Sequence, residues 1–184
     1  DEASERNVIV TNTPGVLTET TADLAFALLI SAARRIPEAD EYSRADEYEG
    51  WELMQPHMGI DVYEKNLGIL GMGRIGTAVA KRAYGGFDMN ILYNDAETNE
   101  KAEAKLDAEF VEFEELLEKS DFLSIHAPLT PETKGMFGTE EFEKMKEDAI
   151  IVNAARGPII DEDALADAIK NGDIRGAAID TFEE

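Results

Sequence analysis

The feature that most constrains this chain is a glycine-rich turn, Gly71-Met72-Gly73-Arg74-Ile75-Gly76, which directly follows a short apolar run, Leu67–Leu70. An apolar run of this length predicts a buried strand, and residues 74–83 after the turn are expected to form a helix. In such a unit the first glycine makes the tight turn, the second lets a phosphate approach the backbone, and the third lets the helix pack on its strand. The free amides that begin the helix then favour an anion.

Short apolar runs alternate with longer helical patterns along the rest of the chain. The expected strands are 8–11, 67–70, 89–93, 109–111, 122–126, 150–152 and 177–179. The expected helices lie around 24–32, 38–49, 74–83, 113–119, 142–145 and 161–170, with a loop at 50–60, a turn at 84–87 and a charged connector at 94–108. This alternation predicts an α/β fold, a doubly wound parallel sheet of Rossmann type, organised as a single cofactor-binding domain.

Charge and composition exclude several classes of protein. The chain has 184 residues, with 40 Asp and Glu against 17 Lys and Arg, a net charge of −23 and no cysteine. Such a surface disfavours nucleic acid, and no apolar run approaches the ~20 residues of a membrane span. Without cysteine there is no disulfide scaffold or Cys nucleophile, which favours a cytoplasmic location, and no metal site is expected. The acidic excess is typical of a salt-adapted source.

An acidic residue ends the strand after the glycine turn. Asp95 lies 24 residues after Gly71, near the offset of about 20 residues expected for a carboxylate that binds the adenosine ribose hydroxyls. A carboxylate there repels a 2′-phosphate, so the sequence predicts NAD in preference to NADP. Two alternatives remain at this point: a structural glycine turn with an ordinary loop acid, and a methyltransferase, which uses a similar turn and acid.

Five blocks of sequence, one of which contains the glycine turn, carry a family resemblance. They are VTNTPGVLTETTADLAFALL at 10–29, DVYEKNLGILGMGRIG at 61–76, SDFLSIHAPLTPETKGMF at 120–137, NAARGPIIDEDALADAI at 153–169 and GAAIDTFEE at 176–184. In this order they resemble the D-isomer-specific 2-hydroxyacid dehydrogenases, in the glyoxylate/hydroxypyruvate reductase-like branch. The resemblance implies that 1–184 is the NAD-binding domain, cut from a longer two-domain enzyme, with the substrate domain absent.

The same resemblance assigns the cofactor-binding residues. Besides the three glycines, Arg74 and Ile75 match the positions whose amides meet the pyrophosphate. Ala127 and Thr133 match the loop that lines the adenosine side. Ala154 matches a position near the nicotinamide, and Asp180 matches the acid that holds its carboxamide.

One arginine matches the family's substrate-binding residue. Arg156, in an Asn-x-x-Arg-Gly stretch, corresponds to the arginine that binds the carboxylate of a 2-oxo acid and polarises its carbonyl. A guanidinium suits this task because it stays charged and forms a fork to two oxygens. The alternative is an ordinary surface ion-pair residue. Neither His57 nor His126 stands in the family's acid/base motif, and the partner glutamate expected five positions after Asp180 falls beyond Glu184.

The implied activity is hydride transfer between NAD(H) and a small 2-hydroxy or 2-oxo acid, glyoxylate or hydroxypyruvate. The isolated chain is expected to bind NAD without useful turnover. A non-catalytic NAD-sensing module of the same fold is the competing interpretation. Family members pair through this domain, so a homodimer is expected, with the apolar helix at 22–33 and the loop around Trp51 as its contact surfaces.

Overall fold

The computed structural model describes residues 2–183 and contains a six-stranded, wholly parallel sheet in the order β3-β2-β1-β4-β5-β6. The strands are β1 (Asn66–Leu70), β2 (Asn90–Asn94), β3 (Glu109–Phe110), β4 (Phe122–Ile125), β5 (Ile150–Asn153) and β6 (Gly176–Ile179). β4 and β5 are buried along their whole length, as expected for parallel strands that are covered on both faces.

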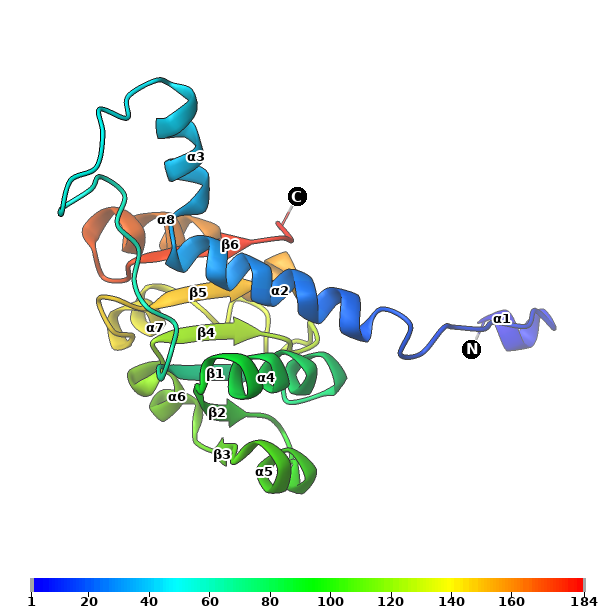
Figure 1. Cartoon of the computed structure of the whole chain (residues 1–184). Coiled ribbons are helices and arrows are strands. Elements are labelled where there is room, and N and C mark those ends of the chain that lie inside the picture. Colours follow the sequence, from blue (N-terminus) through cyan, green and yellow to red (C-terminus); the bar gives the residue numbers. More distant parts are fainter. Residues whose placement is uncertain (1, 184) are drawn as a thin grey trace.

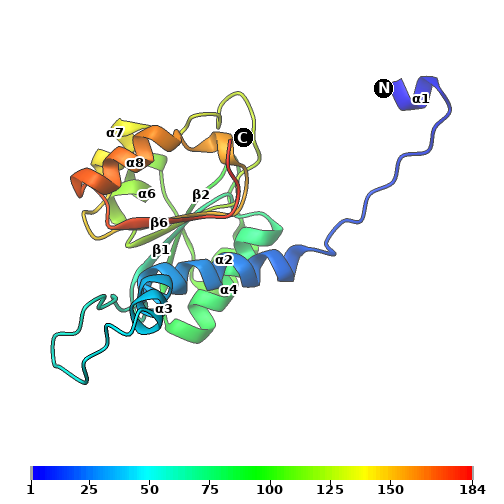
Figure 2. The ribbon, with the colours of Figure 1, turned by 90° about the horizontal axis from the view of Figure 1, so that it is seen from above.

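Helices cover both faces of the sheet (Figure 2). One face carries α2 (Thr18–Ala33) and α4 (Arg74–Phe87), and the other carries α6 (Phe113–Lys119), α7 (Thr139–Lys144) and α8 (Glu162–Asn171). α3 (Ile36–Arg44) follows α2 and extends past the β6 edge of the sheet (Figure 1). Three smaller elements are α1 (Glu2–Glu5), α5 (Glu100–Leu106) and the 3₁₀ turn η1 (Gly157–Ile159). The prediction of an α/β fold with a doubly wound parallel sheet is therefore confirmed.

Each face of the sheet has its own apolar core. Phe26 and Leu29 of α2 and Val79 of α4 belong to one core, together with Ile69 and Tyr93 of the strands. The opposite core contains the helix residues Leu116, Phe142 and Leu165. Together the two cores hold the strands rigidly, so that the segments following them have defined positions.

Three local predictions were wrong. The β-branched run at 8–11 forms no strand, because Val8, Ile9 and Val10 lie on an extended arm with no neighbouring strand and are 58%, 89% and 75% exposed. Residues 84–87 continue α4 rather than forming a turn, and the helix ends instead at Asp88 in the left-handed conformation. The charged connector contains α5, whose first turn is capped by the side chain of Asn99.

Two segments project from the body of the molecule. The arm that carries α1 extends beyond the edge of the sheet to which the strand arrows point, and the loop at 45–61 extends at the other end, beyond α3 (Figures 1 and 2). Within residues 2–183, no helix combines the length and apolar character that crossing a membrane requires.

Candidate functional site

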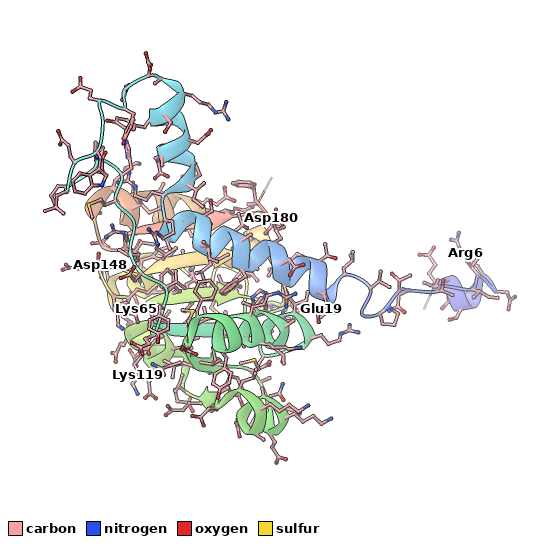
Figure 3. The ribbon with its side chains drawn as sticks, in the orientation of Figure 1. Arg6, Glu19, Lys65, Lys119, Asp148 and Asp180 are labelled. Carbon is pink, nitrogen blue, oxygen red and sulfur yellow. The ribbon has the colours of Figure 1, made fainter. Side chains whose placement is uncertain are left out.

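The candidate residues all follow the carboxyl end of a strand. Because the strands are parallel, these ends meet at one edge, where the labelled Asp180 lies in Figure 3. From β1 the strands β2 and β3 are added on one side, and β4, β5 and β6 on the other, so the strand order reverses between β1 and β4. Ligands of open α/β sheets bind at such a switch point. The glycine turn follows β1, Asp95 follows β2, Ala127 follows β4, Arg156 follows β5 and Asp180 follows β6.

Gly71 is required by both conformation and space. Its φ of +93° lies in the left-handed region, and a Cβ atom there would stand 2.7 Å from the Ala127 nitrogen and 2.8 Å from the His126 carbonyl carbon. The Gly71 amide donates a hydrogen bond to the Asn94 carbonyl at 2.9 Å. The turn therefore sits tightly between the ends of β2 and β4, with no room for a side chain.

The other two glycines meet different demands. A Cβ on Gly73 would contact nothing within 4 Å, so a ligand has open access to the backbone at the start of α4. A Cβ on Gly76 would overlap the Gly71 carbonyl oxygen and crowd Ile69, so this glycine lets the helix pack on β1. No side chain caps the amides that begin α4, and the exposed Arg74 forms no ion pair among residues 2–183. These features fit a pyrophosphate group.

Asp95 borders a hollow of about 600 Å³ beside the glycine turn. The hollow is lined by Met72 and by residues 95–101, among them the acids Asp95, Glu97 and Glu100 and the single cation Lys101. The Asp95 carboxylate accepts a hydrogen bond from the Ala96 amide at 2.7 Å, which holds it at the end of β2. Because three carboxylates and one amine line this hollow, its negative charge repels a phosphate group.

The loop after β4 closes on itself. The Thr133 hydroxyl donates to the Pro128 carbonyl at 2.7 Å and accepts from the Thr130 amide at 2.8 Å. Its oxygen therefore shapes the loop. Ala127 is buried against Gly71 and forms part of the floor of the glycine turn.

His126 stands at the same edge and is half-buried. Its Nε2 atom lies 2.8 Å from the Ser124 hydroxyl, and burial lowers the pKa of the imidazole to about 4. At neutral pH the ring is uncharged and is held by β4, so His126 is a neutral part of the site wall.

Arg156 is presented by a rigid turn at the end of β5. The fully buried Asn153 accepts a hydrogen bond from the Ala155 amide and donates one to the Arg156 carbonyl, both at 3.0 Å. The Arg156 side chain is exposed, and its Nη1 donates to the Ala155 carbonyl at 2.6 Å. Among the described residues no carboxylate pairs with it, so the ion-pair alternative has no support and the guanidinium is available to a ligand.

The last strand brings Asp180 to the same turn. Its amide donates to the Asn153 carbonyl at 3.0 Å, while its side chain is exposed. Gly157 leaves room for the chain to pass at Phe182, because a Cβ on Gly157 would overlap the Phe182 backbone. Asn153 thus connects the segments that carry Arg156 and Asp180. Ala154 follows Asn153 at this edge and is half-buried.

The other histidine lies away from this edge. His57 is on the projecting loop, where its ring packs edge-on against Tyr42 of α3 at 5.6 Å. In the part of the chain that the structure describes, no group of three His, Cys, Asp or Glu side chains is arranged to hold a metal ion.

Two asparagines at the site had no assigned role in the sequence analysis. Asn153 shapes the arginine turn, and Asn99 bonds to the glycine turn through its side chain. Asn99 precedes Glu100 and Glu103, which is a recognisable signal for the start of a helix. That signal predicts the cap, whereas the bond to the glycine turn depends on the packing of α5 against α4.

Known proteins match the chain closely. The family model of the D-isomer specific 2-hydroxyacid dehydrogenase NAD binding domain matches residues 26–184. A glyoxylate reductase of Korarchaeum cryptofilum is 54% identical over all of this chain, and a glyoxylate/hydroxypyruvate reductase B of Erwinia tasmaniensis is 48% identical over 98% of it. A crystal structure of a protein from Thermus thermophilus superposes with a TM-score of 0.91 at 42% identity, over 98% of this chain.

The chain spans only part of these relatives: 55% of the first, 56% of the second and 56% of the crystallised protein. The matched family model covers most of the chain and describes the domain that the glycine turn and the strand order also indicate. The chain belongs to the D-isomer specific 2-hydroxyacid dehydrogenases and contains their NAD-binding domain.

Proposed function

We propose that this chain is the cofactor-binding domain of a two-domain reductase that uses NADH to reduce glyoxylate, hydroxypyruvate or another small 2-oxo acid. The observation that carries the proposal is the Arg156 guanidinium, which forms no ion pair among residues 2–183. Asn153 holds the main chain of the turn that presents it, at the same edge as the glycine turn. The names of the relatives from Korarchaeum cryptofilum and Erwinia tasmaniensis support this substrate class.

The cofactor would lie along the carboxyl edge of the sheet. The open backbone at Gly73, the uncapped amides of α4 and Arg74 would bind the pyrophosphate. Asp95 would accept hydrogen bonds from the adenosine ribose, with Ala127 and the loop closed by Thr133 on the adenosine side.

Opposite the adenosine site, Ala154 would border the nicotinamide and Asp180 would hold its carboxamide, because both residues follow neighbouring strands at this edge. Ile75, the second residue of α4, would contribute its amide to the pyrophosphate site. Together these positions trace a path for the cofactor across β2, β1, β4, β5 and β6.

In the reaction, Arg156 would bind the substrate carboxylate with its forked N–H groups and polarise the neighbouring carbonyl. When bound, the reduced nicotinamide supplies the hydride that the carbonyl carbon receives. By the family resemblance, proton donation to the new alkoxide would come from a histidine outside these 184 residues. His126 is unsuited to that task, because burial lowers its pKa to about 4 and the ring is therefore neutral at physiological pH.

Cofactor binding can be tested on the 184-residue chain by calorimetry with NADH and NADPH. We expect micromolar-to-millimolar binding of NADH, weaker binding of NADPH, and no reduction of glyoxylate by this chain alone. Asp95→Ala should narrow the difference between the two cofactors, whereas Asp61→Ala, an exposed acid before β1, should not. Absence of NADH binding would refute the proposal, and turnover by the chain alone would refute its restriction to binding.

The catalytic assignment can be tested in the complete protein. Arg156→Ala should lower kcat/KM for glyoxylate by on the order of a hundredfold or more, since a bidentate charged contact is lost. Arg156→Lys should recover little of it, because an ammonium cannot form the fork. NADH binding without any reduction of 2-oxo acids would instead favour the non-catalytic NAD-sensing module.

We also propose a homodimer. The projecting loop carries exposed apolar side chains, namely Tyr48, Trp51, Leu53, Met54 and Met58. By contrast, Phe26 and Leu29 of α2 are buried in the chain's own core, so the loop is the better candidate contact. Sedimentation over a range of concentrations should show dimers that the double variant Trp51→Ser, Leu53→Ser weakens; a wild-type chain that stays monomeric would contradict this proposal.

A further inference from the structure

Asn99 occupies a junction between the glycine turn and the ribose side of the candidate site. Its Nδ2 atom donates to the Met72 carbonyl at 2.8 Å, across 27 positions of sequence. Its Oδ1 atom accepts from the Ala102 amide at 3.1 Å, which caps α5. One side chain therefore joins the middle of the glycine turn to the helix that follows Asp95.

The bond from Asn99 to the Met72 carbonyl determines the direction of the Gly73 N–H group. The Met72 carbonyl and the Gly73 N–H belong to one planar trans peptide and point in opposite directions. The carbonyl also accepts a hydrogen bond from the Thr77 hydroxyl at 3.2 Å. With its carbonyl held by Asn99 and Thr77, the peptide directs the Gly73 N–H away from these two residues, and the Gly73 backbone has open space around it.

The backbone of Asn99 holds the loop that follows Asp95. Its amide donates to the Tyr93 hydroxyl at 2.7 Å, and that hydroxyl donates to the Glu103 carboxylate at 2.6 Å. Burial, followed by the hydrogen bond with Glu103, raises the pKa of Tyr93, so the phenol keeps its proton. The loop from Asp95 to Asn99 is thereby tied at both ends to β2, and it lines the hollow of about 600 Å³ that Met72 also borders.

We propose that Asn99 is a positioning residue that holds the phosphate-binding peptide and the Asp95 loop at a fixed separation. It thereby sets both the affinity for NAD(H) and the discrimination against the 2′-phosphorylated cofactor. The inference rests on the proposed function, because it assumes that the pyrophosphate and the ribose occupy these two positions. The Asn99 side chain acts through its bonds to Met72 and Ala102.

Three variants separate this role from simple helix capping. Asn99→Ser keeps a good capping oxygen but is too short to reach Met72, whereas Asn99→Ala loses both bonds. Thr77→Val removes the second donor to the Met72 carbonyl and a long contact with Asn99 at 3.5 Å, but it keeps the bonds of Asn99 to Met72, Ala102 and Tyr93. Asn90→Ala is the matched control, because Asn90 begins the same strand β2 and its side chain donates to the Asn66 side chain at the opposite edge of the sheet.

The experiment is calorimetric titration of each 184-residue variant with NADH and with NADPH, together with its melting temperature. We expect Asn99→Ser and Asn99→Ala to weaken NADH binding by about fivefold or more, the equivalent of one lost hydrogen bond. The NADH-to-NADPH affinity ratio should fall at least twofold to threefold in both. Thr77→Val should weaken both cofactors with an unchanged ratio, and Asn90→Ala should change neither. Only Asn99→Ala should also lose the stability of the α5 cap.

The outcomes separate the two proposals. If the wild-type chain does not bind NADH, the proposed function fails. If it binds and Asn99→Ser retains wild-type affinity for both cofactors, the positioning role of Asn99 is overturned. If Asn99→Ser weakens NADH and NADPH equally, the link between Asn99 and the Asp95 loop is overturned, and only the effect on the phosphate-binding peptide stands.

Discussion

At the scale of single residues, the glycines of the turn meet distinct physical demands. Gly71 is needed for its positive φ and its contact with the end of β4, Gly73 for the open approach to the backbone, and Gly76 for the packing of α4 on β1. Their spacing indicated all three demands in the sequence, because each follows from the geometry of a strand, a tight turn and a helix. The atoms that each glycine avoids are known only from the fold.

Substitution of these glycines should separate stability from binding. Gly71→Ala should lower the free energy of unfolding by about 2–4 kcal/mol, through backbone strain and overlap with Ala127. Gly73→Ala should leave stability within about 1 kcal/mol yet weaken NADH binding about tenfold or more, by occupying the space the phosphate needs. Gly85→Ala, in the open part of α4, should stabilise by up to about 1 kcal/mol. Urea unfolding measures the stability of each variant, and calorimetric titration measures its affinity for NADH. Equal NADH affinity of Gly73→Ala and wild type would contradict the prediction.

His126 should make stability depend on pH. Burial lowers its pKa to about 4 from an ordinary value of 6.5, so the unfolded chain takes up this proton at a higher pH than the folded chain. The resulting contribution of His126 to the free energy of unfolding is fully present above pH 6.5 and is lost as the pH falls toward 4. Between about pH 7 and about pH 5 it should amount to about 2 kcal/mol.

The measurement is the free energy of unfolding of wild type and His126→Gln at several pH values from about 7.5 to about 5. The difference in stability between the two proteins should shrink as the pH falls. A wild-type curve parallel to that of His126→Gln would contradict the assignment of a buried neutral ring.

At the scale of elements, α2 illustrates where a sequence pattern is ambiguous. Its apolar spacing predicted a helix, and α2 does span Thr18–Ala33, but the same pattern suits a core helix and an interface helix. In the fold, Phe26 packs edge-on against Phe87 of α4 at 5.2 Å and is 8% exposed. Arg82 of α4 also binds the α2 carboxylates of Glu19 and Asp23, at 2.8 and 2.6 Å.

Removing the Phe26 ring should therefore loosen α2. Phe26→Ala should lower the free energy of unfolding by about 3 kcal/mol through the cavity between α2 and α4. Leu24→Ala on the same helix is the control; Leu24 is 41% exposed, so its loss should cost less than about 1 kcal/mol. Denaturant unfolding gives the free energy of unfolding of both variants. Similar losses of stability for Phe26→Ala and Leu24→Ala would show that the buried Phe26 ring does not hold α2 to α4.

At the scale of the whole molecule, the dominant feature is excess negative charge. Ten ion pairs form among residues 2–183, against 40 acidic residues in the chain, so most carboxylates face water without a cation. The cofactor is itself an anion and gains nothing from this long-range field. Its binding must depend on the amides of α4 and on Arg74.

Screening this charge should stabilise the fold. Between about 0.1 M and about 2 M KCl the melting temperature should rise by several degrees, as repulsion between carboxylates is screened. The quadruple variant E47Q, E49Q, E143Q, E147Q removes four exposed acids that form no ion pair and should show a smaller rise. A melting temperature of the wild-type chain that is independent of KCl would contradict the prediction and the salt-adapted origin behind it.

The sequence by itself determined the α/β class, the strand-turn-helix unit and the segments that gather at the carboxyl edge. These features depend on residues a few positions apart and on the rule that parallel strands place their carboxyl ends together. Two of the three wrong predictions, at 8–11 and 84–87, came from short apolar or glycine-containing runs whose structure depends on which elements lie beside them.

Only the tertiary structure decided which polar atoms meet. The bond of Asn99 to Met72, the bond of Asp180 to Asn153 and the burial that lowers the pKa of His126 all depend on how α5, β6 and β4 pack. Neither propensity nor periodicity specifies such contacts, because each depends on the position of two elements relative to one another. The sequence thus located the candidate site, and the packing of its elements determined which side chains are charged, neutral or held in place there.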